Sequence, residues 1–248
     1  MGACSDLSPP IGCRNWTSGT FKVGATMDSG EARTMKLYDY YRSSAAFRMR
    51  IALNLLGTAY EREYIHLRRK DQVSEAYLAV NPQGLVPALV DDDGTVLTQS
   101  MAMIEYLHET RPERSSFLPD DAKGRARVRA IAQAISCDIH PINNLRVLRL
   151  LGSEFGIDED ARNERWYKHW ITEGMTGLEG MLSSDATGQY AHGDSPTMAD
   201  ICLVPQVFNA LRFGCDLSAF PTVLRIYETC IALEEFSSAF PDLQPDAE

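Results

Sequence analysis

Between residues 35 and 110 the apolar pattern switches repeatedly between the two-residue period of a strand and the longer period of a helix. Phe47, Ile51 and Leu55 recur at helical spacing, and Gly57 follows where a glycine commonly ends a helix. The expected elements, in order, are a strand over 36–40, a helix over 44–56, a strand over 60–67, a helix over 72–79, strands over 85–90 and 95–100, and a helix over 101–110. This order predicts a small α/β sandwich with one mixed four-stranded sheet.

The pattern after residue 121 is helical throughout. A proline-containing linker, RPERSSFLPDD (111–121), precedes it. The expected helices cover 122–151, 159–183, 198–213 and 222–236. We therefore expect an α/β domain over residues 35–115 and an all-helical domain over 122–245. Within the second, Thr197 and Asp200 have the spacing of a helix capping box, which we interpret as structural.

Residues 1–34 are rich in Gly, Ser and Thr and keep no sustained period. They also lack the apolar centre of a secretory signal. We consider two interpretations: a disordered leader, or a start codon assigned too early, with Met35 as the real beginning.

The charge balance argues against two classes of partner. With 34 acidic and 24 basic residues among 248, the formal net charge is -10, which disfavours nucleic acid and anionic membranes. The six cysteines are scattered without metal-ligand spacing, and the five histidines form no H-x-x-x-H pair. We expect no metal, and reduced thiols in a cytoplasmic protein.

The stretch Arg42-Ser43-Ser44 stands where the first strand becomes the first helix. A helix N-terminus has N–H groups without partners and a partial positive charge, so it stabilises an anion. One serine is expected to cap the helix, which leaves the other hydroxyl and the arginine for a ligand. No cysteine occupies residues 43–47, so a reacting thiol must arrive with the ligand.

Two more strand-to-helix turns of this domain carry ligand-binding features. Pro87 interrupts an apolar run, which indicates either an edge strand or a cis Val86–Pro87 bond that turns the Val86 backbone outward. Such a backbone is able to pair with a peptide. Gln99 and Ser100 start the next helix, where a carboxylate would meet free N–H groups. One ligand with a backbone-like amide and a carboxylate would satisfy all three turns.

The chain resembles the zeta class of glutathione transferases, which includes maleylacetoacetate and maleylpyruvate isomerases. The resemblance runs from Met35 almost to the C-terminus and is carried by RSSAAFRMRIAL (42–53), NPQGLVPAL (81–89), TQSMAMIEYL (98–107) and TMADICLVPQVFNALRF (197–213). The segment CDIHPINNLRVL (137–148) resembles the maleylpyruvate isomerase branch. The resemblance implies a thioredoxin-like N-terminal domain, an all-α C-terminal domain, glutathione as cofactor, and a homodimer.

By resemblance, Ser43 points its hydroxyl at the glutathione sulfur, with Ser44 and Arg42 beside it. The other glutathione contacts implied are Val86 and Pro87 for the cysteinyl backbone, Gln99 and Ser100 for the γ-glutamyl end, and Gln83 and His66 for the glycyl side. The sequence departs from the class at Ala45, where relatives often have Cys or Thr. We therefore expect the glutathione thiol pKa to be lowered less than in those relatives.

The implied reaction is cis–trans isomerisation of a maleyl double bond by reversible thiolate addition. A dicarboxylate substrate needs a local cationic clamp in this acidic protein, and arginine binds carboxylates bidentately. The substrate-site residues implied are Arg42, Arg146, Arg212, His140 and Asn144, with Asn144 expected on one helix with His140 and Arg146.

The resemblance implies maleylacetoacetate as the leading candidate substrate. Residues 137–148 favour maleylpyruvate as the alternative. A transferase that conjugates glutathione to small electrophiles would use the same thiolate site. A binding module without activity would not need Ser43, Pro87, Gln99 and Ser100 together.

Overall fold

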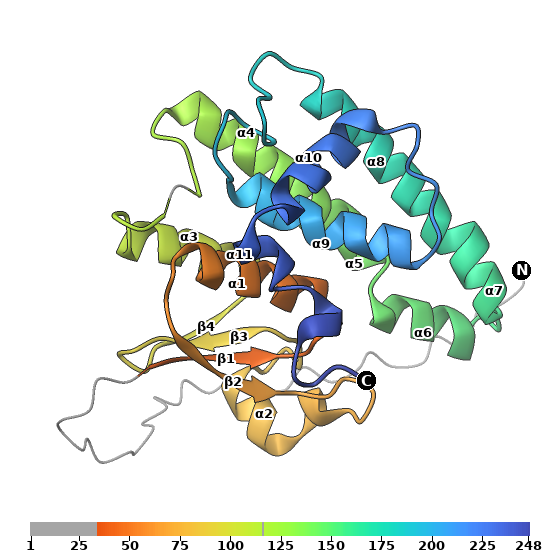
Figure 1. Ribbon diagram of the computed structural model, residues 1–248. Coiled ribbons are helices and arrows are strands. Elements are labelled where there is room, and N and C mark those ends of the chain that lie inside the picture. The colour runs from red at the N-terminus through yellow and green to blue at the C-terminus, as the bar shows by residue number, and fades with distance from the viewer. Residues whose placement is uncertain (1–33, 116) are drawn as a thin grey trace, which may run out of the picture. The chain divides into compact units, whose positions relative to one another are not determined.

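Four short strands form one mixed sheet in the order β2-β1-β3-β4 (Figure 1). The computed structural model describes residues 34–115 and 117–248, so both interpretations of the leader concern residues outside those described, apart from Thr34. The strands are β1 (Met35–Asp39), β2 (Tyr60–Tyr64), β3 (Ala88–Val90) and β4 (Val96–Thr98). β1 pairs parallel with β2 and antiparallel with β3, which pairs antiparallel with β4. The expected mixed four-stranded sheet is confirmed.

Helices cover both faces of this sheet. The first part of the chain contains α1 (Ser44–Leu55), η1 (Asp71–Val73), α2 (Glu75–Val80) and α3 (Ser100–Thr110). Figure 1 shows α1 and α3 on one face and α2 on the other. The strand period explains the split, because alternate side chains of β1 point to opposite faces. Leu37 joins the large core under α1, whereas Tyr38 packs against Tyr77 of α2 with ring centroids 5.5 Å apart.

No strand follows β4 among the elements that the structure describes. The helical part contains α4 (Ala122–Gln133), η2 (Ala134–Ile139), α5 (His140–Ile142), α6 (Leu145–Ser153), α7 (Glu159–Ala161), η3 (Arg162–Tyr167), α8 (Lys168–Leu182), α9 (Met198–Arg212), α10 (Pro221–Ile231), α11 (Glu234–Ser237) and η4 (Pro241–Leu243). The expected fold class, α/β followed by all-α, is confirmed. Within residues 34–115 and 117–248, no helix has the length and apolar character needed to cross a membrane.

The helix α1 joins the two parts of the chain. Phe47 makes edge-to-face contacts with Phe208 of α9 and Phe240, at 5.9 and 5.4 Å between centroids. One continuous apolar core therefore runs from the sheet through α1 into the helices above it (Figure 1). The capping box predicted at the start of α9 is also confirmed, since Asp200 accepts from the Thr197 N–H at 2.8 Å.

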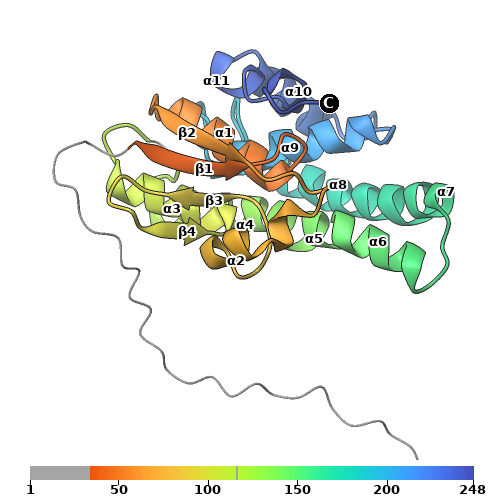
Figure 2. The same cartoon turned by 90° about the horizontal axis from the view of Figure 1, so that it is seen from below.

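The single helix predicted over 122–151 is wrong, because the chain breaks between α5 and α6. Pro141 has no N–H to donate, and a π-helical segment, η2, precedes it. Asn144 has extended backbone (φ -66°, ψ 147°), and its side chain accepts from the Arg146 N–H at 3.1 Å. Trp166 Nε1 donates to the Ile142 carbonyl at 2.9 Å, which satisfies one group freed by the break. Figure 2 shows α6 continuing from there alongside α7 and α8.

The last predicted helix is also divided. The helices α10 and α11 are separated at Leu233, whose backbone is extended (φ -83°, ψ 136°). This turn brings Phe236 into the core, where it is fully buried. Apolar spacing alone predicted a continuous helix over 222–236, because Leu233 and Phe236 keep the helical period across the turn.

A buried ion pair fixes the junction between β1 and α1. Arg50 Nη1 donates to Asp39 Oδ1 at 2.7 Å, and neither side chain is exposed. Arg50 also donates to the carbonyls of Tyr41 and Ala239, both at 3.0 Å. One guanidinium thus connects the end of β1, the turn before α1 and the chain after α11.

We expect Arg50→Met to lower the free energy of unfolding by about 3–5 kcal/mol, because it leaves the buried Asp39 carboxylate without its counter-ion, with only the Tyr40 N–H still bonded to it. Urea unfolding measures the change. Lys36→Met is the control, since Lys36 and Glu63 form an exposed pair at 3.5 Å whose loss costs about 1 kcal/mol or less. Asp39→Asn added to Arg50→Met should recover part of the loss. Equal effects of Arg50→Met and Lys36→Met would contradict this assignment.

Candidate functional site

Ser43 is the N-cap of α1. Its backbone is extended (φ -73°, ψ 116°), and its Oγ accepts from the Ala46 N–H at 3.2 Å. Ser44 is buried and is the first residue of the helix, so Ser43 is the serine that caps it. Because Ser43 acts only as an acceptor in the cap, its hydroxyl hydrogen is available to a group beyond the helix end. The two roles considered for this serine are therefore compatible.

Two arginines from distant parts of the sequence, Arg42 and the exposed Arg212, act on one another through their charges. Arg42 stacks on the Tyr41 ring at 5.0 Å, and Arg212, at the end of α9, stacks on the Phe213 ring at 4.6 Å. Desolvation, together with the positive charge of Arg42, lowers the pKa of Arg212. Arg212 is held by Asn209, whose Oδ1 accepts from Nε at 3.2 Å and from Nη2 at 2.8 Å. Two cations that repel each other favour a ligand with negative charge.

The N-terminus of α3 lacks a side-chain cap. Gln99 precedes it in the left-handed region (φ +69°), a conformation that costs a non-glycine residue energy and that concentrates at functional sites. The Gln99 side chain donates from Nε2 to Gln83 Oε1 at 2.8 Å. The first N–H groups of α3 therefore remain available to an anion. The contact between Gln83 and Gln99 was not expected, because the sequence analysis assigned them to opposite ends of glutathione.

The Val86–Pro87 peptide bond is cis, which confirms one of the two interpretations of Pro87. The preceding Leu85 carbonyl accepts from Tyr77 Oη at 2.6 Å and from Asn81 Nδ2 at 2.7 Å. By contrast, the Val86 N–H and C=O have no hydrogen bond within the described parts of the chain. They are the backbone groups expected to pair with a peptide-like ligand.

Arg48 is a buried residue that the sequence analysis did not select. Its Nη1 donates to Ser100 Oγ at 3.4 Å, and its Nη2 bonds His140 Nδ1 at 3.2 Å. It thereby connects the α3 N-terminus with α5. A sequence signal was present, because α1 is apolar on nearly all sides and a charged residue within it has no route to solvent.

His140 and Arg146 are on different helices, α5 and α6, and Asn144 lies between them in the chain. Burial first, then the charges of Arg48 and Arg146, lower the pKa of His140 to about 3, so the imidazole is neutral. Asn144 is the N-cap of α6, and Arg146 is an exposed residue in its first turn. The prediction that His140, Asn144 and Arg146 share one helix is therefore wrong, because the break at Asn143 separates them.

His66 is engaged by the end of the chain. Its Nδ1 accepts from the Arg69 N–H at 3.2 Å, so Nε2 carries the hydrogen that bonds Glu248 Oε1 at 2.9 Å. Asp246 Oδ2 accepts from the Tyr41 N–H at 3.0 Å. His66 Nε2 is therefore a hydrogen-bond donor suited to a carboxylate. In this structure the Glu248 carboxylate accepts that hydrogen bond.

Asp91, Asp92 and Asp93 form an acidic cluster at the turn between β3 and β4. Asp91 pairs with Arg111 at 2.7 Å and accepts from Tyr106, while Asp93 accepts from the Thr95 N–H at 2.7 Å. Asp92 Oδ2 lies 3.6 Å from Arg111 Nη2, and together these are the contacts of a hairpin turn.

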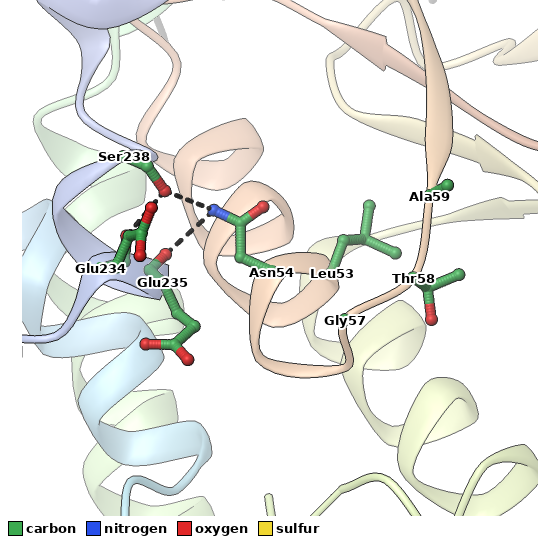
Figure 3. Close-up of a pocket in the computed structure, with 8 residues that line it drawn as sticks. All are labelled: Leu53, Asn54, Gly57, Thr58, Ala59, Glu234, Glu235 and Ser238. Carbon is green, nitrogen blue, oxygen red and sulfur yellow. Dashed lines mark hydrogen bonds between the residues drawn. The ribbon is translucent and has the colours of Figure 1, made fainter.

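A separate hollow of about 340 Å³ lies at the other end of α1 (Figure 3). Asn54 crosses it to reach the Glu235 carbonyl at 3.0 Å and Ser238 Oγ at 3.1 Å. The twelve residues of α1 span about 18 Å, so this hollow is far from Ser43. It contains none of the residues selected from the sequence.

Comparison with known proteins agrees with this geometry. Residues 37–115 match the glutathione S-transferase N-terminal domain. Maleylacetoacetate isomerase of Rhizobium meliloti (strain 1021) is 50% identical over 83% of this chain and 95% of its own. A holo structure of maleylpyruvate isomerase, a bacterial zeta-class glutathione S-transferase, has a TM-score of 0.82 at 46% identity and covers 86% of this chain and 100% of its own.

A structure of maleylacetoacetate isomerase from Methylobacterium extorquens AM1, with bound malonate and GSH, has a TM-score of 0.83 at 42% identity. It covers 86% of this chain and 99% of its own. The chain therefore belongs to the glutathione S-transferase family, in the zeta-class group that contains the maleylacetoacetate and maleylpyruvate isomerases.

Proposed function

We propose that this protein is a glutathione-dependent cis–trans isomerase that converts maleylacetoacetate to fumarylacetoacetate. The observation that carries the proposal is the start of α1, where the Ser43 cap leaves a hydroxyl hydrogen free next to Arg42, and where the charge of Arg42 also acts on Arg212. A thiolate at the helix N-terminus and a dicarboxylate on the arginines would then be neighbours. The relative with bound malonate and GSH supports this combination, since malonate is itself a dicarboxylate.

The residues fit glutathione, a tripeptide thiol with two carboxylates. The uncapped α3 N-terminus, with Gln99 and Ser100, suits the γ-glutamyl carboxylate. The free Val86 backbone suits the cysteinyl amide. Gln83 and His66 are the candidates for the glycyl side, where His66 offers a hydrogen-bond donor.

When bound, glutathione supplies a thiolate that adds to the conjugated double bond and is eliminated after the bond rotates. Ser43 holds that sulfur as a thiolate by donating its free hydroxyl hydrogen, and the start of α1 adds its partial positive charge. Arg42 and Arg212 hold the substrate carboxylates and offset the negative charge that develops on the substrate. Ala45 contributes no thiol or hydroxyl, so activation rests on Ser43 and the helix.

Maleylpyruvate is the second candidate substrate, because residues 137–148 and the 46% identical maleylpyruvate isomerase favour that branch. Ser44 is assigned to the catalytic end of α1 with Ser43 and Arg42, while Arg146, His140 and Asn144 are assigned to the substrate side. The domain limits 35–115 and 122–245, a homodimer and a cytoplasmic location complete the proposal.

The activity is tested by following the absorbance of maleylacetone and of maleylpyruvate with purified protein, with and without catalytic glutathione. We expect loss of the cis acid only when glutathione is present, without consumption of thiol. The better substrate then decides between the two acids. Steady thiol loss with a chlorinated electrophile and no isomerisation would instead assign a conjugating transferase.

We expect Ser43→Ala to lower turnover about a hundredfold, because the donor to the sulfur is lost. The cap is lost as well, so the unfolding free energy should fall by about 1 kcal/mol. Steady-state kinetics and urea unfolding measure the two effects separately.

Ser74→Ala is the matched control for Ser43→Ala. Ser74 caps α2 with the same geometry, since its Oγ accepts from the Tyr77 N–H at 3.3 Å, but it belongs to no part of the proposed site. It should lose similar stability and keep turnover. If Ser43→Ala kept wild-type turnover, Ser43 would have no part in the mechanism.

We expect Arg212→Ala to raise KM for the maleyl acid at least tenfold, because one arm of the clamp is lost. Activity towards a neutral electrophile should change by less than about twofold, since it has no carboxylate to bind. Arg114→Ala, at an exposed site, controls for the change in net charge. Equal losses with the acid and the neutral electrophile would refute the clamp.

A further inference from the structure

Arg48 is a buried cation without a counter-ion in the described structure. Its exposed fraction is 2%, and no acidic side chain in residues 34–115 or 117–248 forms an ion pair with it. Its Nε is buried and has no hydrogen-bond partner among those residues. An unpaired buried charge costs several kcal/mol, so its presence calls for an explanation.

The groups that surround Arg48 are neutral. His140 has a pKa of about 3, and burial raises the pKa of the nearby Cys202 thiol to about 11. Ser100 offers only a hydroxyl. Desolvation accordingly lowers the pKa of Arg48 itself. The missing negative charge must therefore come from outside this set of side chains.

We propose that Arg48 is a positioning residue for both halves of the site: it directs the Ser100 hydroxyl to the α-carboxylate of the γ-glutamyl group and fixes His140 as an Nε2–H donor. This inference rests on the proposed function, because the missing anion is the glutathione carboxylate. Arg48 acts through Ser100 and His140 and does not itself contact the ligand.

The glutathione half of the argument follows from hydrogen-bond direction. A guanidinium only donates, so Ser100 Oγ accepts from Arg48 and its own hydrogen is left for another acceptor. Ser100 opens α3, whose first N–H groups have no side-chain cap. A carboxylate there would receive the hydroxyl, the free N–H groups and the field of the cation behind them.

The substrate half follows from the same rule. Because Arg48 donates to His140 Nδ1, that nitrogen carries no hydrogen and Nε2 must carry it. His140 is partly exposed as a residue, and Nε2–H is the donor that its ring would present to a ligand. Loss of Arg48 would leave the neutral ring free to adopt either tautomer.

The first test is isothermal titration calorimetry of Arg48→Met with two ligands. One is glutathione, and the other is 4-aminobutyryl-cysteinylglycine, which lacks only the α-carboxylate. We expect Kd for glutathione to rise about tenfold and Kd for the analogue to stay within about twofold of the wild-type value. Arg48→Lys, which keeps the charge without the two-armed geometry, should lie between wild type and Arg48→Met.

Arg127→Met is the control for loss of a partly buried arginine. Arg127 also forms no ion pair with an acidic side chain in the described parts of the chain, and it donates to the carbonyls of Ala191 and Met181 at 2.6 and 3.2 Å. It should change stability and leave the ratio of the two affinities unchanged. If Arg48→Met weakened both ligands equally, the role would be structural and the proposal would be wrong.

The second test needs no ligand and no activity. Long-range ¹H–¹⁵N spectra of the wild-type protein should show His140 as the Nε2–H tautomer, and spectra of Arg48→Met or Arg48→Lys should show a mixture. An Nδ1–H tautomer in the wild type would overturn the proposal even if Arg48→Met failed to fold. If the wild-type protein bound no glutathione, the proposed function would be wrong. The His140 spectrum would still test the Arg48–His140 hydrogen bond independently.

Discussion

The Asp39–Arg50 ion pair determines where the reacting end of α1 lies. The guanidinium of Arg50 binds the last residue of β1, the Tyr41 carbonyl and the Ala239 carbonyl, so three segments share one anchor. Residues 40–43 connect β1 to α1, and Arg50 bonds this connection at its start, through Asp39, and within it, through the Tyr41 carbonyl. The direction of Arg42 and the position of the Ser43 hydroxyl depend in part on this buried charge, because Arg50 bonds the Tyr41 carbonyl within the turn.

Arg48 and Arg50 lie two residues apart on α1 and point in different directions, with different consequences. Arg50 meets a carboxylate at 2.7 Å and holds the fold together. Among the residues that the structure describes, Arg48 bonds only a hydroxyl and an imidazole. A helix that needed only rigidity would gain nothing from an unpaired cation, because an apolar side chain of similar size would pack at lower cost. The contrast separates a structural arginine from one maintained for a ligand.

The sequence predicted those features that depend on local chemistry. A serine cap at residue 43 or 44, the Thr197–Asp200 capping box and the order of the strands follow from residue type and spacing, and all are present. The break at Asn143 was missed because the apolar period continues through it, although Pro141 gave a local signal. The left-handed backbone of Gln99 and the contacts of Arg48 depend on elements distant in sequence, which periodicity does not reveal.

The end of the chain lies against the site and not away from it. Glu248 bonds His66, and Asp246 bonds the backbone of Tyr41, next to Arg42. Any residues that follow Glu248, native or added as a purification tag, must start beside the groups assigned to the glycyl end of glutathione. A fusion at this end would change the entrance that a kinetic measurement is meant to probe. Residues 246–248 therefore lie against the segment around residues 41–66 that carries the candidate site.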